Sequence, residues 1–131
     1  MEIVDNFARK QHLMIMLSIP YPPSGNHMWK HAKGKHYLTD QARRYYEQVA
    51  WVIRSSGLAM GLECRLEVEV DIYPPDKRKR DLSNVIKVVE DACTKAGLWQ
   101  DDSQIDRLVL QRMPNIKDGA IALRIAPTGA E

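Results

Sequence analysis

The chain has 131 residues, of which 44% are hydrophobic and 27% are charged, and its formal net charge at pH 7 is +2. This composition excludes wholesale disorder and predicts one globular domain with a modest core. The small net charge does not by itself indicate a nucleic-acid partner, so that argument depends on where the cations cluster. The first residues, MEIVDNFARKQH, are polar and do not resemble a secretion signal. We therefore expect a flexible extension over residues 1–12 and a single domain over residues 13–131.

The first predicted element is the apolar segment from Leu13 to Ile19, which is ended by Pro20. It is too short to span a membrane and is typical of a buried strand. The next segment, YPPSGNHMWKHAKGKHY, is rich in Pro, Gly, His and Lys. We expect a long loop there, with a function beyond connecting two elements.

Thr39 or Asp40 is predicted to cap a helix that runs to about Ser56 and stops at Gly57. The apolar residues of this segment recur at roughly helical spacing. The segment from Cys64 to Tyr73 instead alternates apolar and charged residues. This alternation predicts a strand with one face in water.

A central helix with one apolar face is predicted over about Leu82 to Ala96, closed by Gly97. Two strands follow, at about Ile105 to Met113 and Ala120 to Ala126, and the turn signal Asp118-Gly119 predicts that they form a hairpin. This order of elements predicts an α/β or α+β fold, with a single mixed β-sheet packed against two main helices.

Cys64 and Cys93 are the only cysteines, and both fall at apolar positions of predicted elements. This favours two reduced, buried thiols in a cytoplasmic protein. A paired-cysteine zinc motif is absent from the sequence.

The stretch KRKRDLSNVIKVVEDACTKAGLWQDDSQI, residues 77 to 105, carries most of the chemical information. It opens with four consecutive cations: Lys77, Arg78, Lys79 and Arg80. Asp81 follows at the predicted start of the central helix, Lys87 lies further along that helix, and the acidic pair Asp101-Asp102 lies beyond its end. Cations that bind a polyanion, beside carboxylates that suit a hard metal ion, indicate an enzyme that cuts a phosphate backbone.

Each of these residues also has an ordinary structural interpretation. Asp81 is a good helix N-cap, and Lys87 has the spacing to pair with Asp91 one turn further on. Asp101-Asp102 is common loop composition, and runs of charge are usually solvated. The occurrence of all of them within one short span favours the functional interpretation.

The long loop adds residues suited to phosphates and exposed bases: His27, Trp29, Lys30, Lys33 and Lys35. His27 and His31 have a spacing that would suit zinc on a helix. The prolines and glycines of the loop argue against a helix, so a zinc site is the less favoured alternative.

Taken together, these motifs resemble the RusA family of Holliday junction resolvases of bacteria and their phages. The likeness covers nearly the whole chain after the first dozen residues. It is carried by PYPPSGN after the early strand, by PPDKRKRDLSNVIK, by KAGLWQDDSQI, and by the spacing between these parts. The resemblance implies a Mg²⁺-dependent endodeoxyribonuclease, with Mn²⁺ as an alternative metal, in DNA recombination and repair. It also implies a cytoplasmic homodimer, with no membrane partner, that nicks four-way DNA junctions symmetrically.

The same resemblance assigns catalysis and metal binding to Asp81 and Asp102, and it makes Lys87 the catalytic lysine. Asn84 and Asp101 match neighbouring motif positions with supporting roles, Asn84 on the DNA and Asp101 near the metal. Lys77 to Arg80 and the long loop would then bind flanking phosphates.

One position departs from the family pattern, which reads Asp-Leu-Asp-Asn where this chain has Ser83 in place of the second aspartate. A hydroxyl is a neutral and weaker metal ligand than a carboxylate. Three explanations stay open: Asp101 or another acid substitutes, Ser83 binds the metal through water, or cleavage is weak. The last leaves an alternative function, a protein that binds junctions but has weak or lost cleavage. A nuclease that prefers flaps or replication forks is a third possibility.

Overall fold

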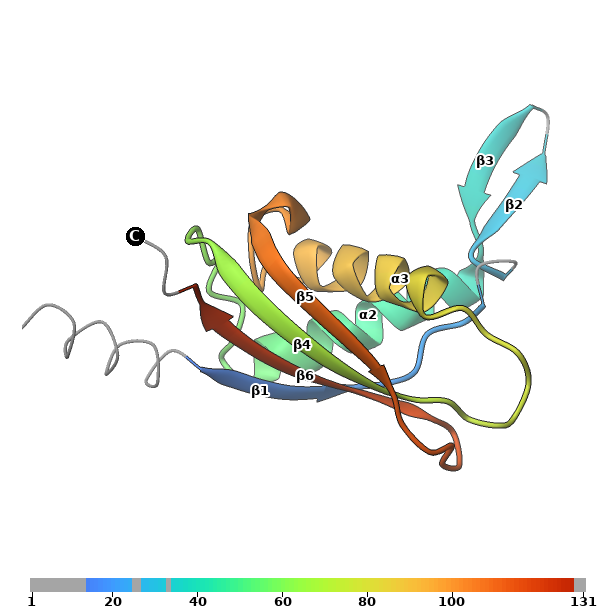
Figure 1. The fold of residues 1–131 in the computed structure, drawn as a ribbon. Helices are drawn as coiled ribbons and strands as arrows, with labels where there is room; N and C mark the ends of the chain where they lie inside the picture. The colour runs from blue at the N-terminus through green and yellow to red at the C-terminus, as the bar shows by residue number, and fades with distance from the viewer. Residues whose placement is uncertain (1–13, 25–26, 33, 129–131) are drawn as a thin grey trace, which may run out of the picture.

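The computed structural model describes residues 14–24, 27–32 and 34–128, with only the backbone of residues 31, 32, 35 and 36. A four-stranded sheet forms one layer, and two helices form a second layer on one of its faces (Figure 1). The strands are β1 (Ile15–Ile19), β4 (Leu66–Tyr73), β5 (Ile105–Arg112) and β6 (Ala120–Pro127), and the helices are α2 (Asp40–Ser55) and α3 (Leu82–Lys95). A short 3₁₀ turn, η2 (Asp102–Gln104), precedes β5. The predicted α+β fold with one mixed sheet and two main helices is confirmed.

The strand order is β1-β6-β4-β5. β6 runs antiparallel to both β1 and β4, whereas β5 runs parallel to β4 and is reached through α3. The predicted hairpin of the last two strands is therefore wrong, although Asp118 and Gly119 do form a turn, with φ of 65° and 67°. β6 buries Ile121, Leu123 and Ile125 and pairs on both sides, so it takes an inner position in the sheet.

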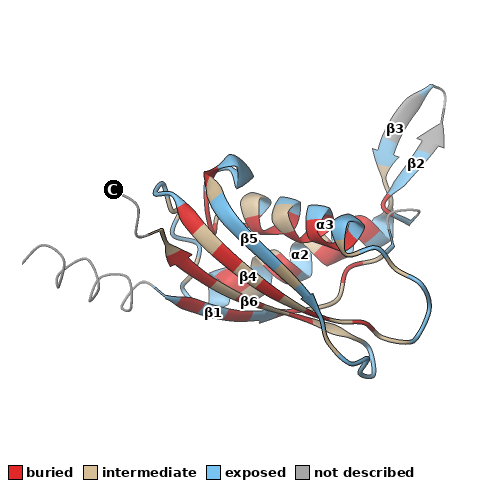
Figure 2. Ribbon diagram, in the orientation of Figure 1, coloured by how far each residue is buried: buried red, intermediate tan, exposed pale blue. Residues whose placement is uncertain are grey.

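Both helices are amphipathic, and each places its apolar face on the sheet (Figure 2). In α2, the Thr39 hydroxyl caps the first turn by accepting a hydrogen bond from the Ala42 N–H at 3.1 Å. Gly57 and Gly97 follow the two helices with positive φ, as predicted for helix stop signals. The core between the two layers includes alternate residues of the inner strands, among them the buried Val68 and Val70 of β4.

Two further predictions need correction. The long loop contains a second, two-stranded sheet, formed by β2 (Trp29–Ala32) and β3 (Lys35–Leu38), which turns through Gly34 at φ +73°. Cys64 is exposed, because β4 begins only at Leu66; Cys93 is buried as predicted, and burial raises the pKa of its thiol to about 12.

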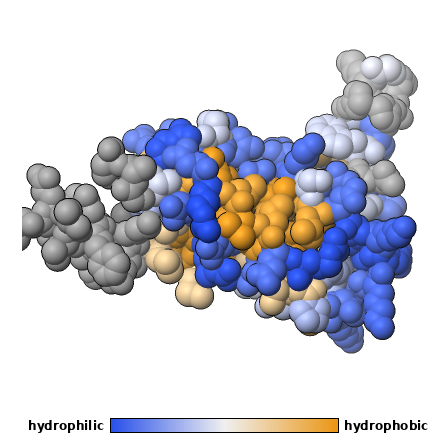
Figure 3. Space-filling model, viewed as in Figure 1, coloured by the Kyte–Doolittle hydropathy of each residue, from blue (hydrophilic) through white to orange (hydrophobic). Residues whose placement is uncertain are grey.

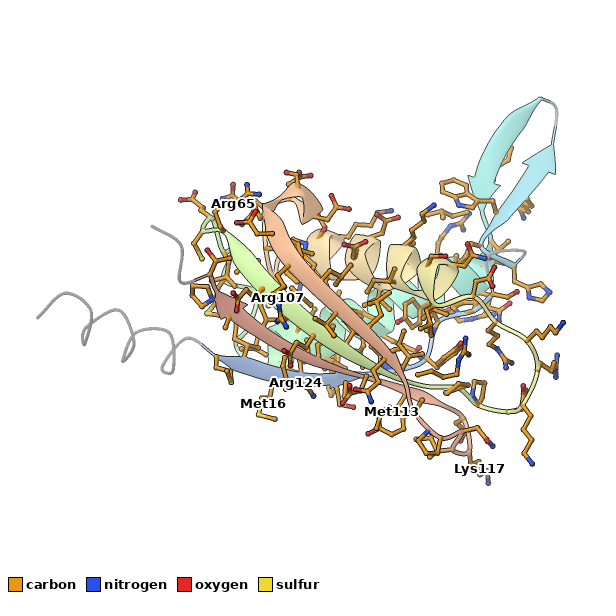
Figure 4. All side chains as sticks on the ribbon, in the orientation of Figure 1. Met16, Arg65, Arg107, Met113, Lys117 and Arg124 are labelled. Atoms are coloured by element: carbon orange, nitrogen blue, oxygen red, sulfur yellow. The ribbon has the colours of Figure 1, made fainter. Side chains whose placement is uncertain are left out.

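The face of the sheet opposite the helices is charged. Arg124 pairs with Glu69 and Asp71, and Arg107 also pairs with Glu69, so that side chains of three strands form one ion-pair network (Figure 4). Among the residues that the structure describes, no helix is long and apolar enough to span a membrane.

Candidate active site

A pocket of about 490 Å³ lies beside the N-terminal end of α3. Its walls come from the segment after β1, from the loop of residues 74–81 and from the first turn of α3. The polar residues that line it include His27, Arg78, Lys79, Arg80, Asp81 and Asn84. The structure thus brings five of the predicted DNA contacts together with one predicted metal ligand.

Asp81 occupies the N-cap position of α3 without capping the helix through its side chain. Its backbone is extended, with φ −86° and ψ 128°, and its carboxylate accepts no hydrogen bond from the first turn. The backbone carbonyl of Asp81 instead accepts from the N–H groups of Asn84 and Val85, at 3.2 and 3.3 Å. A carboxylate that has no capping bond to lose can turn toward a cation, so Asp81 fits the predicted metal site.

Asp76 organises the cationic loop, a role that the sequence reasoning missed. Its carboxylate accepts from the Arg80 guanidinium at 2.6 Å and from the Arg78 backbone N–H at 2.9 Å. These two bonds, the Arg80 bond first, lower the pKa of Asp76 to about 2. The run Pro74-Pro75-Asp76, typical of a turn, was the only signal for it.

The four consecutive cations therefore separate into different roles. Arg80 is held in the loop: its side chain is 21% exposed and lies 5.8 Å from the centre of the Tyr21 ring. Arg112, at the end of β5, donates to the Arg80 carbonyl at 2.8 Å. Lys77 and Lys79 are exposed and, within the described part of the chain, form no ion pair. These lysines are the better candidates for binding phosphate.

Tyr21 connects this pocket to the turn before β6. Its hydroxyl is buried and has no hydrogen-bond partner among the residues that the structure describes, and burial raises its pKa. A Cβ atom at Gly119 would lie 2.9 Å from both the Tyr21 Cβ and the Tyr73 carbonyl oxygen. Glycine is therefore required at position 119, both for this close approach and for its positive φ.

Lys87 and Ser83 are both exposed on α3. Lys87 lies six residues after Asp81, which corresponds to about 9 Å along the helix axis. The alternative that Lys87 pairs with Asp91 is not seen among the ion pairs of the described residues. The lysine is thus available to a phosphate near the pocket.

Asp101 and Asp102 differ in what they already bind. The Asp101 carboxylate caps η2 by accepting from the Ser103 N–H at 3.1 Å and from the Ser103 hydroxyl, and these bonds lower its pKa. Asp102 has no such bond and is exposed. Asp102 is therefore the better candidate metal ligand of the two.

The buried Gln104 fixes the position of this acidic turn, and the sequence reasoning had passed over it. Its side-chain oxygen accepts from the N–H groups of Gln100 and Asp101 at 2.9 and 2.8 Å. Its side-chain nitrogen donates to the carbonyls of Leu62 and Cys64 at 2.7 and 2.9 Å. One side chain therefore ties η2 to the segment that leads into β4.

Glu90 is a further carboxylate near Asp102 that the sequence reasoning did not single out. Burial raises the pKa of Glu90, and the negative charges of Asp102 and Asp91 raise it further. Two carboxylates close enough to repel one another suit a divalent cation between them. Glu90 is thus an acid that could join Asp102 at a metal ion, although it lies in the C-terminal half of α3 whereas Ser83 lies in the first turn.

The predicted metal ligands do not all meet within one chain. Asp81 lies at the start of α3, whereas Asp102 lies in η2, beyond the opposite end of this helix of about 21 Å (Figure 1). Within the described ranges, no group of three or more His, Cys, Asp or Glu residues could hold a metal ion.

The β2–β3 hairpin projects from the end of the molecule where α3 begins (Figure 1). Trp29, which is 51% exposed, and the exposed Lys30 lie on it. Lys33 and the side chain of Lys35 lie outside what the structure describes, as does the side chain of His31 that the zinc alternative needs.

The cationic loop of residues 74–81 ends at Asp81, whose side chain does not cap α3. This arrangement suits a protein that binds a polyanion beside a divalent cation. The sequence profile of one such class, endodeoxyribonuclease RusA, matches residues 20–126. The chain belongs to the RusA family.

Individual relatives agree with this assignment. The crossover junction endodeoxyribonuclease of Enterobacteria phage 82 is 36% identical over 115 residues, which cover 88% of this chain and 96% of the relative. The enzymes of the same name from Escherichia coli strain K12 and Shigella sonnei strain Ss046 are 35% and 34% identical over the same coverage.

Proposed function

We propose that the chain is a Mg²⁺-dependent endodeoxyribonuclease that resolves four-way DNA junctions by paired, symmetric nicks, acting as a homodimer in the cytoplasm of a bacterial or phage-infected cell. The observation that carries the proposal is the carboxylate of Asp81, which caps no helix N–H and lines a pocket with Arg78 and Lys79. The relatives, all named crossover junction endodeoxyribonucleases, support the choice of substrate.

Asp81 and Asp102 lie at opposite ends of α3 within one chain, so the homodimer would have to bring them together to hold one metal ion, with Asp101, Glu90 or a water on Ser83 completing the ligands. A bound Mg²⁺ supplies an activated water and offsets the negative charge that grows on the phosphate. Carboxylate oxygens are the ligands that this hard ion prefers.

The cationic side chains position the DNA and stabilise charge. Lys77 and Lys79 bind phosphates flanking the cut, while Asp76 holds Arg80 and the backbone of Arg78 so that the loop keeps its shape. Lys87, about two helical turns from Asp81, donates to the phosphate oxygen where charge develops. Trp29 and Lys30 on the hairpin extend the contact to an exposed base and its phosphate.

The test is a cleavage assay on a synthetic four-way junction, with Mg²⁺ and with a chelator in its place. We expect Mg²⁺-dependent nicking of two opposed strands, and its loss in Asp81→Asn and in Asp102→Asn. Asp118→Asn is the matched control, because Asp118 is an exposed aspartate in the turn before β6 where asparagine tolerates the same positive φ. If either site variant keeps full Mg²⁺-dependent cleavage, its assignment as a metal ligand is wrong.

Ser83 favours one competing function, a protein that binds junctions without cutting them. Such a protein would bind four-way DNA with strong salt dependence, show no metal-stimulated nicking, and gain nicking on Ser83→Asp. Parallel assays on a fork and a linear duplex at matched salt separate a junction resolvase from a nuclease with another preferred substrate.

A further inference from the structure

The β2–β3 hairpin is held to the body of the protein at its base. Met28, directly before β2, is 2% exposed and packs in the hydrophobic core. Thr39, directly after β3, donates its backbone N–H to the Met28 carbonyl at 3.0 Å and its hydroxyl to the His27 carbonyl. The same hydroxyl oxygen caps the first turn of α2. Because both strands are anchored in this way, the base of the hairpin has a fixed direction relative to the sheet and the helices.

Each face of the hairpin carries an exposed aromatic side chain close to this base. Trp29 is opposed to Leu38 in the strand pairing, and Lys30 is opposed to Tyr37. Directly opposed residues point to the same face, and neighbours along a strand point to opposite faces. Trp29 and Tyr37 therefore lie on opposite faces, and Lys30 shares the face of Tyr37. The exposed fractions of the two aromatic residues are 51% and 38%.

The hairpin lies beside the cationic end of the molecule, where α3 begins (Figure 1). His27, which precedes Met28, lines the same pocket as Arg78 and Lys79. Figure 3 shows a large apolar patch over β5 and α3 and not on the described part of the hairpin, so the two aromatic rings are separate from that patch. Flat rings beside cations suit the bases and phosphates of a nucleic acid.

Rings on opposite faces of one projection can stack on two different bases at the same time. In a linear duplex, neighbouring bases are already stacked on one another, and a side chain that enters between them must first separate them at a cost in free energy. At the crossing point of a four-way junction the stack is already interrupted, so this cost is lower. A projection with an aromatic ring on each face therefore favours branched DNA over linear duplex.

We propose that the β2–β3 hairpin is a wedge at the crossing point of the junction, with Trp29 stacked on the end of one arm and Tyr37 on the end of the neighbouring arm. Lys30 binds a phosphate of the arm that Tyr37 contacts. The inference rests on the proposed junction-cleaving function and deepens it, because it assigns the preference for branched DNA to two side chains outside the pocket.

The ratio of junction affinity to duplex affinity tests the wedge, measured with a chelator in place of Mg²⁺ so that no strand is cut. We expect Trp29→Ala and Tyr37→Ala each to weaken junction binding by about tenfold, the effect of losing one base–aromatic stack. Binding to a linear duplex of the same sequence should stay nearly unchanged, which also shows that the variants are folded. Equal losses on both substrates, or no loss on the junction, overturns the inference.

The chain offers a matched control for the loss of an aromatic ring. Trp51 is 71% exposed on α2, so Trp51→Ala removes an exposed tryptophan from another element and should leave the affinity ratio at the wild-type value. Trp29→Phe and Tyr37→Phe keep a ring at each position and should keep most of the junction affinity. Loss of selectivity in Trp51→Ala to the same extent would contradict a specific role of the hairpin.

Fluorescent bases in the junction test whether the two faces meet two arms. A fluorescent adenine analogue replaces the base next to the crossing point of one arm at a time, and its emission changes when a neighbouring ring stacks on it. We expect Trp29→Ala to change the signal from one arm in each half of the junction and Tyr37→Ala to change the signal from the other arm. If both variants act on the same arm, or neither acts on any arm, the wedge is wrong.

Nicking of the same junction is assayed separately with Mg²⁺. A chain that nicks junctions while its hairpin variants keep wild-type selectivity would refute this inference and leave the proposed function standing. A chain whose junction preference depends on Trp29 and Tyr37 but that never nicks a strand would do the reverse. A wild-type chain that binds junction and duplex equally well also overturns the inference.

Discussion

Asp81 and Asp101 are both aspartates at N-cap positions, but only the side chain of Asp101 caps its helix. Asp101 accepts hydrogen bonds from Ser103 and closes η2, whereas Asp81 leaves the first turn of α3 without a side-chain cap. A capping bond is worth about 1 kcal/mol, so a helix that forgoes one at an N-cap aspartate gives up stability. This loss of helix stability occurs at Asp81, the residue where the proposed metal would bind.

Ser83 would set the charge of the proposed metal site if that position contacts the metal. We expect Ser83→Asp to tighten Mg²⁺ binding by about tenfold or more, or about 1.4 kcal/mol, because a carboxylate replaces a neutral hydroxyl in the first turn of α3. Calorimetric titration with Mg²⁺ measures the change. Ser83→Asn is the control, since it adds the same volume without the charge. Equal affinities of the two variants would show that position 83 does not contact the metal.

Asp76 gives the loop of residues 74–81 a defined pH dependence. Its pKa falls from 3.8 to about 2 in the folded protein, because Arg80 and the Arg78 N–H bind the charged form. A lowered pKa means stabilisation that is complete above the unfolded value and is lost as the pH falls toward 2.

We therefore expect Asp76→Asn to be destabilising at neutral pH, and the difference from wild type to shrink between about pH 4 and pH 2. Urea unfolding across this range measures it. Asp40→Asn is the control, because it removes an exposed ion pair with Arg43 at the start of α2 and leaves Arg78 and Arg80 untouched. A difference that does not depend on pH would mean that Asp76 does not hold Arg80 as a charged pair.

Among the elements, the two helices and β4 were predictable because each carries its own local pattern. α2 begins after Thr39 and ends before Gly57, and α3 ends before Gly97, all close to the predicted positions. The pairing of β5 and β6 was not predictable, since the Asp118-Gly119 turn is compatible with a hairpin and with a strand that crosses β4. Choosing between them depends on which strand pairs with a neighbour on both sides, a property of the assembled sheet.

The candidate site also has residues that the sequence predicted and residues that it did not. The motif placed Asp81 and Lys87 on α3, and the structure agrees with those positions. Gln104 and Glu90 were missed because their importance lies in contacts with residues distant in sequence or in burial. Asp76 was missed although its partners Arg78 and Arg80 are only two and four residues away, because the folded shape of the loop decides whether they meet. The identity of a polar residue does not by itself show whether its side chain is buried.

The η2 turn depends on one such side chain. We expect Gln104→Leu to lower the free energy of unfolding by about 2–4 kcal/mol, because it leaves several backbone groups without partners. Gln100→Leu, which removes only an exposed bond to Glu63, is expected to cost less than about 1 kcal/mol. Urea unfolding compares them, and equal effects would contradict the role of Gln104.

At the scale of the whole molecule, charge is segregated rather than large. The net charge is only +2, yet the exposed face of the sheet is an ion-pair network while the pocket end carries unpaired lysines. DNA affinity should therefore depend on where a lysine lies and not on the total charge.

We expect Lys79→Ala to reduce the slope of log K against log salt for junction binding by about 0.9, the value of one phosphate contact. Lys117→Ala removes the same charge from the turn before β6, where Figure 4 places Lys117 away from α3, and should leave the slope unchanged. Binding assays between 50 and 200 mM salt, as an order-of-magnitude range, measure both. Equal slopes for the two variants would mean that binding follows net charge alone.

The position of β6 has a consequence for how the protein folds during its synthesis. β6 is synthesised after the other strands that the structure describes, yet it is an inner strand that separates β1 from β4. While the chain is still emerging from the ribosome, β4, α3 and β5 can assemble as a local unit, but β1 has no partner strand and the sheet cannot close. Completion of the core, and with it any activity toward DNA, therefore waits until β6 has left the ribosome.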